Sequence, residues 1–141
     1  MLLPVALEQT IQFAPPKPAD FVADLLTLSN AEQPRRLAAF LPIFDPDAQE
    51  KIALLLKKQA DHFMRTDLQR CLDVADLIQQ MAALTANPLF HALGLRAEGN
   101  AYTIGGGDYQ RGIACYDEAA AIYSRFHRLL DQAWSQNGKI Y

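Results

Sequence analysis

The sequence lacks an excess of basic charge and a long hydrophobic run, and each absence excludes a class of protein. Its 141 residues contain 13 Lys and Arg against 16 Asp and Glu, a formal net charge of −3, whereas nucleic-acid-binding domains ordinarily carry a basic patch. No apolar run approaches the ~20 residues that a transmembrane helix needs. The apolar opening contains Pro4 and Glu8 and has no basic segment, which is unlike a signal peptide. We expect no nucleic-acid or membrane partner and a cytoplasmic location.

Cysteine and histidine are too few and too scattered for a disulfide framework or a zinc site. Cys71 and Cys115 lie within apolar helical patterns, where free thiols behave as small hydrophobes in a reducing compartment. A His62–Cys71 nucleophile pair would need an orienting group and oxyanion donors, and no motif supplies them. His91 and His127 have no carboxylate or second histidine at metal-ligand spacing. We therefore expect buried thiols, no catalytic residue, no metal and no cofactor.

Strand patterns are also missing, because no stretch of four to eight residues alternates apolar and polar side chains. Helical i, i+3, i+4 spacing covers most of the chain. Asn30, with a glutamine three residues later, predicts a capping box, and Asp45 before Pro46 predicts a helix start. We expect an all-α fold with helices over residues 20–28, 30–41, 46–65, 68–84, 89–104 and 109–125 and a last helix from residue 129.

The last third of the chain repeats one pattern of apolar, glycine and tyrosine positions. The second copy follows the first by 39 residues. A glycine inside a helix costs on the order of 1 kcal/mol relative to alanine, so its recurrence needs a structural reason. We expect a neighbouring helix to approach closely at each glycine, with tyrosines filling the adjacent space. The matching positions are Leu95, Gly99 and Tyr102, then Trp134, Gly138 and Tyr141.

Together with Gly112, Tyr116 and Ala119, this pattern resembles the tetratricopeptide repeat, in which an aromatic, a Leu-Gly pair and a tyrosine precede a small residue and a further aromatic. The chain departs from that pattern at Glu98, where leucine is usual, and its period exceeds the family's ~34 residues. A degenerate copy, in which Gln59 replaces the glycine, lies about one period earlier. The resemblance implies antiparallel helix pairs stacked as a right-handed α-solenoid.

The spacing of the repeat copies predicts how the chain is divided into units. A proline-rich stretch ends the first 18 residues, and such stretches favour extended polyproline II structure. Terminal units of a solenoid are atypical because one of their faces meets solvent. We expect an extended arm at 1–18, an atypical N-terminal helix pair at 19–46, a degenerate repeat unit at 47–88, a repeat unit at 89–128 and the first helix of a further, truncated unit at 129–141.

A second resemblance covers the front half. Leu25-Leu26, then Arg35-Arg36-Leu37 with Phe40-Leu41-Pro42, and then Asp45-Pro46 are similar to the N-terminal region of large bacterial tetratricopeptide proteins. Many of these end in a caspase-like CHAT peptidase domain. This resemblance implies an alternative function, the regulatory or sensor arm of a larger CHAT-type cysteine protease or signalling protein, whose catalytic pair would lie beyond this chain.

In tetratricopeptide arrays the first helix of each pair lines a concave groove. The resemblance implies a scaffold that binds a peptide or a partner domain there, with no chemistry of its own. A subset of the family binds a terminal carboxylate with a basic residue and an asparagine spaced like Arg96 and Asn100. A third alternative is a purely structural cap, or self-association through the unfinished C-terminal helix. The expected groove residues are Phe63, Met64, Arg96, Asn100, Thr103, Ser135 and Lys139.

Overall fold

The computed structural model describes residues 14–127, and all regular structure in this range is helical. It includes a 3₁₀ helix, η1 (Leu41–Ile43), and a π-helix, η2 (Ala101–Gly105). The expectation of an all-α chain is therefore confirmed for the described range. Within that range no helix combines the length and apolarity needed to span a bilayer. The α-helices of residues 14–127 are α2 (Pro18–Thr27), α3 (Glu32–Phe40), α4 (Pro46–Phe63), α5 (Leu68–Thr85), α6 (Pro88–Asn100) and α7 (Tyr109–Arg125).

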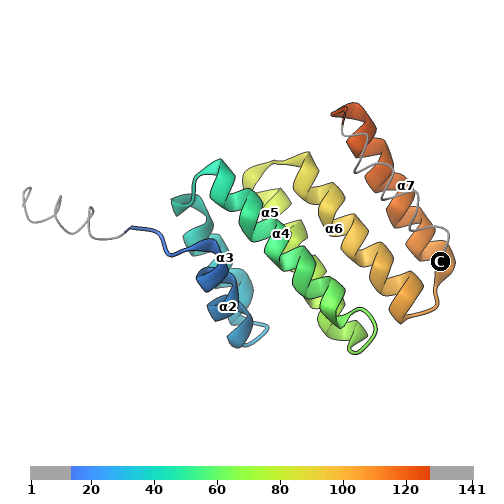
Figure 1. Cartoon of the computed structure of the whole chain (residues 1–141), viewed down its shortest axis with the longest axis horizontal. Helices are drawn as coiled ribbons and strands as arrows, with labels where there is room; N and C mark the ends of the chain where they lie inside the picture. The colour runs from blue at the N-terminus through green and yellow to red at the C-terminus, as the bar shows by residue number, and fades with distance from the viewer. Residues whose placement is uncertain (1–13, 128–141) are drawn as a thin grey trace, which may run out of the picture.

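The helices lie side by side in two rows (Figure 1). In the first row α2 contacts α4, and α4 contacts α6. Behind it α3 contacts α5, which also packs against α4 and α6. Helix α7 packs against α6 at the far end. Short links join successive helices, so each one turns back along its predecessor. Residues 14–17 have no regular structure, and the rest of the expected arm lies outside the described residues.

Side-chain caps set the starts of four helices. The side chains of Asp45, Asp67, Asn87 and Asp108 each accept a hydrogen bond from a backbone N–H in the first turn that follows, at 2.8–3.2 Å. Each cap satisfies a donor that the helix itself leaves unpaired and is worth ~1 kcal/mol. The helix start expected at Asp45-Pro46 therefore lies where the sequence signal places it, and α6 begins one residue before the expected residue 89.

The capping box expected at Asn30 is wrong. The Asn30 amide faces α5, where its Nδ2 lies 3.5 Å from the Asp73 carboxylate. The Gln33 amide donates to the carbonyl of Leu28 instead of reaching back to a cap. Ser29 Oγ accepts the first N–H of α3 at 3.3 Å. The cross-helix contact to α5 thus takes the asparagine away from local capping.

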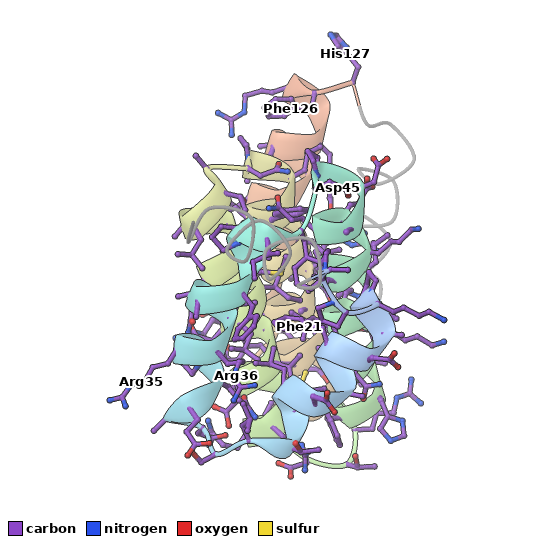
Figure 2. The ribbon with its side chains drawn as sticks, turned by 90° about the vertical axis from the view of Figure 1, so that its left-hand side faces the viewer. Phe21, Arg35, Arg36, Asp45, Phe126 and His127 are labelled. Carbon is purple, nitrogen blue, oxygen red and sulfur yellow. The ribbon has the colours of Figure 1, made fainter. Side chains whose placement is uncertain are left out.

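Two apolar clusters form the core. The larger one joins α2, α3, α4, α5 and the inner side of α6, and its fully buried members include Leu25, Leu37 and Ile52. At its N-terminal end Phe21 points inward, whereas Arg35 points away from the ribbon (Figure 2). The smaller cluster lies between α6 and α7 and contains Ala92, Leu95, Cys115, Ala119, Ile122 and Tyr123.

Helices α6 and α7 approach closely at two glycines. A Cβ built on Gly99 would lie 2.6 Å from the Tyr116 ring, and one built on Gly112 would collide with Thr103 Cγ2. The close approach expected at Gly99 is therefore present, and Tyr116 is the side chain that fills the space. Tyr102 lies elsewhere, packed against the smaller cluster with the guanidinium of Arg111 4.4 Å from its ring centroid.

We predict that Gly99→Ala destabilises the protein despite the better helix propensity of alanine. The new methyl group would press on the buried Tyr116 ring, and such overpacking costs about 1–3 kcal/mol, more than the roughly 1 kcal/mol gained in propensity. Urea unfolding followed by circular dichroism measures the change. Gly106→Ala is the control, since its φ is −104° and its nearest neighbours lie 3.4 Å from the added Cβ. Equal stability of wild type and Gly99→Ala would contradict the close approach.

Candidate functional site

A pocket of about 220 Å³ opens between the first halves of α4 and α6. Both helices belong to the same row, and their starts lie at the same end of the molecule. We call this feature the α4–α6 pocket. It is lined by Pro46, Asp47, Glu50, Ala53 and Leu54 from α4, by Asn87, Leu89, Phe90, Leu93 and Arg96 at and within α6, and by Tyr123 of α7.

The α4–α6 pocket has an apolar middle between charges of opposite sign. Leu54 is 52% exposed, although it is a leucine beside a packed core, while Phe90 on the opposite helix is buried. Asp47 and Glu50, in the first two turns of α4, supply negative charge at one end. Arg96 supplies positive charge further along α6, and its guanidinium lies 5.9 Å from the centroid of a tyrosine ring of α7.

One helical turn beyond the pocket, a chain of hydrogen bonds joins α4, α6 and α7. Lys57 Nζ donates to both carboxylate oxygens of Asp61, at 2.8 and 2.7 Å. Asn100 Nδ2 also donates to that carboxylate, at 3.1 Å. The hydroxyl of Tyr116 donates to Asn100 Oδ1 at 2.6 Å and lies 3.0 Å from Thr103 Oγ1. We call these five residues the polar chain.

At the buried end of the polar chain, the Thr103 hydroxyl donates a hydrogen bond to the carbonyl of Gly99 at 2.8 Å. A buried polar group without a partner costs about 1–3 kcal/mol, and among the described residues every buried side-chain polar atom has one. Burial lowers the pKa of Lys57, and its ion pair with Asp61 opposes that shift. Burial likewise raises the pKa of Tyr116. Each polar group therefore depends on its neighbour in the chain.

The structure distributes the expected groove residues over three places. Arg96 lines the α4–α6 pocket. Asn100 and Thr103 belong to the polar chain, and Thr103 is only 5% exposed. Phe63 and Met64 pack against the larger core cluster at the opposite end of α4. Ser135 and Lys139, like the repeat positions Trp134, Gly138 and Tyr141, lie outside the described residues.

Sequence reasoning missed the pocket residues Asp47, Glu50 and Leu54 on α4. The resemblance placed the end of that helix in the groove, whereas the pocket lies at its start. Leu54 carried a usable signal. It lies off the stripe that contains Ile52 and Leu56, both fully buried, and a leucine outside the buried stripe of an amphipathic helix is a candidate contact residue.

The described cysteines and histidines form no reactive group. Cys71 and Cys115 are free and buried, as expected, and burial raises the pKa of each thiol to about 11. His62 is exposed, and its ring packs edge-on against the neighbouring Phe63. His91 Nε2 lies 3.5 Å from a carboxylate oxygen of Glu118. Over residues 14–127 no cluster of three or more such side chains could hold a metal ion.

Comparisons of the chain with protein-family models, with curated proteins and with solved structures found no match.

We predict that Tyr116→Phe costs about 1–3 kcal/mol of unfolding free energy, because it leaves Asn100 Oδ1 without its hydrogen-bond donor. Tyr109→Phe removes the same atom from a side chain that is 56% exposed, and we expect its effect to stay within about 0.5 kcal/mol. Urea unfolding of the two variants makes the comparison. Equal effects would show that the polar chain adds nothing to stability.

We also predict that the two thiols make the protein less stable at alkaline pH. A thiol whose pKa is raised in the folded state favours folding below pH 9, and this contribution is lost as the pH rises from 9 toward 11. Urea unfolding at pH 8 and pH 10 should show a loss of roughly 1 kcal/mol for each thiol at pH 10. A Cys71→Ala/Cys115→Ala variant should lose less between the two pH values. The same loss in both proteins would rule out buried thiols as its source.

Proposed function

We propose that this chain is a protein-interaction module, part of a tetratricopeptide-like α-solenoid, which binds a segment of a partner protein in the α4–α6 pocket and carries out no chemistry itself. The observation that carries the proposal is the exposure of Leu54, at 52%, inside a pocket whose other wall is Phe90 and Leu93. Apolar side chains that remain accessible in a concave site are typical anchors for a partner.

The size of the pocket favours a partner side chain over a free small molecule. Small-molecule sites usually enclose 300–1,000 Å³, whereas the α4–α6 pocket holds about 220 Å³. That volume accommodates one bulky apolar side chain presented by a larger molecule. A helix or an extended segment lying across α4 and α6 would present it, in the manner of helical grooves that bind amphipathic segments.

Two features of the fold support a repeat module. Helix pairs follow one another in two rows, and stacked helix pairs of this kind provide extended binding surfaces. Gly99 and Gly112 allow α6 and α7 to approach closely, at positions where the sequence resembles the tetratricopeptide repeat. The two free thiols fit a reducing, cytoplasmic environment.

A carboxylate site at Arg96 and Asn100 is less well supported than an apolar anchor. Asn100 already donates to Asp61 and accepts from Tyr116. The Asn100 amide is therefore engaged within the protein, and the neighbouring Asp61 carboxylate would repel a carboxylate of the partner. The proposal accordingly places the main contact at Leu54 and Phe90.

The test is selection of binding peptides from a displayed random library, followed by measurement of their affinity for two variants. We predict that Leu54→Glu weakens binding at least tenfold, since a charge replaces the exposed apolar anchor. Leu84→Glu is a closely matched control: Leu84 is 51% exposed but lies on α5, away from the pocket. Equal losses in both variants, or a library that yields no binder, would contradict the proposal.

A further inference from the structure

The link between α3 and α4, at the end of the molecule where α2 and α3 begin the two rows, leaves apolar side chains exposed (Figure 1). Phe40, the last residue of α3, is 36% exposed, and Ile43, the last residue of η1, is 48% exposed. Pro42 between them is exposed as well. Their neighbours Leu37 and Leu41 are fully buried, so the exposed side chains lie directly beside the core. We call Phe40, Pro42 and Ile43 the Phe40–Ile43 patch.

We infer that residues 1–13 of this chain dock on the Phe40–Ile43 patch. These residues lie outside the described range, and their sequence is dominated by apolar side chains, with Glu8 as the only charged one. A segment of this composition gains free energy when it leaves water for an apolar surface. The apolar residues of the segment are Met1, Leu2, Leu3, Val5, Ala6, Leu7, Ile11 and Phe13.

The segment joins the described structure beside the patch. The backbone N–H of Phe21, in the first turn of α2, donates to the carbonyl of Lys17 at 2.9 Å. The ring centroid of Phe21 lies 6.3 Å from that of Phe40 and 5.1 Å from that of the buried Phe44. The chain therefore enters α2 one helical turn away from a ring that packs against the Phe40–Ile43 patch.

The segment is long enough to return to the patch. Residues 14–17 have no regular structure and include Pro15 and Pro16. A polyproline II chain rises about 3.1 Å per residue, so residues 14–17 carry the chain roughly 12 Å from α2. An extended chain spans about 3.3 Å per residue, so about four further residues suffice for the return. The large apolar residues that precede this return stretch are Leu2, Leu3, Val5 and Leu7.

Attachment to the same chain favours this occupant over a free partner. A segment held by a short linker has an effective concentration in the millimolar range, on the order of 1 mM, so even a weak apolar contact stays occupied. The docked segment would also cover the end of the two rows, where the terminal unit of a stacked array needs protection of its outer face. The inferred role of residues 1–13 is therefore to cap this end of the molecule.

The experiment attaches a nitroxide spin label to the full-length protein at Glu8→Cys and records the amide signals of the ¹⁵N-labelled chain. Cys71 and Cys115 are buried, so the label attaches at residue 8. We expect the amide signals of Phe40 and Ile43 to lose at least half of their intensity, compared with the same sample after reduction of the label.

Substitutions in the segment separate docking from mere attachment nearby. In the spin-labelled protein, Leu3→Asp/Leu7→Asp should restore most of the lost intensity, because charges replace the apolar contacts. Gln9→Asp/Gln12→Asp adds the same charge at polar positions of the segment and should restore none.

A substitution in the patch makes the reciprocal test. Ile43→Asp should restore the Phe40 signal, whereas Leu84→Asp should leave it weakened, since Leu84 is exposed to a similar degree, 51% against 48%, but lies on α5.

Three results would overturn the inference. One is equal loss of the Phe40 and Ile43 signals with and without Leu3→Asp/Leu7→Asp. Another is the same loss in a mixture of unlabelled ¹⁵N protein with spin-labelled ¹⁴N protein, which would show that the segment reaches a second copy. The third is loss at Leu54 and Phe90 in place of the patch, which would put the segment in the α4–α6 pocket. Failure of peptides to bind that pocket would leave the inference standing.

Discussion

The Asp61 carboxylate is the contact on which the arrangement of α4, α6 and α7 depends. It neutralises the buried Lys57 and accepts a hydrogen bond from Asn100 of α6. Asn100 in turn accepts the hydroxyl proton of Tyr116 of α7, whose ring lies where any side chain at Gly99 would have to go. A buried lysine without a counter-charge would be costly. Asp61 supplies that counter-charge and also joins α4 to α6 through Asn100, and Tyr116 extends this contact to α7.

The Asp61–Asn100 contact also accounts for the position of the α4–α6 pocket. The two helices are joined at Asp61 and Asn100, and the pocket opens toward their starts, where Asp47 and Glu50 stand opposite the beginning of α6. Leu54 lies between these levels and stays half exposed. One apolar side chain thus stays accessible between the two helices, which is the feature that favours binding of a partner segment.

Local signals in the sequence predicted the helices well, because capping and turn residues act within one turn of the chain. Asp45 begins a helix as expected, and Gly99 marks a close approach. Contacts between distant residues escaped prediction. Asn30 satisfies local capping rules yet faces Asp73 of another helix, and the Asp61–Asn100 bond joins residues 39 positions apart. The pocket depends on how α4 is placed against α6, which periodicity alone does not determine.

The central claim is that a partner segment lies between α4 and α6. A crystal structure of the protein with a peptide selected for binding tests it most directly. The account predicts a bulky apolar side chain of the peptide in contact with Leu54 and Phe90. A peptide seated on α5, or on the outer face of α7, would contradict the account.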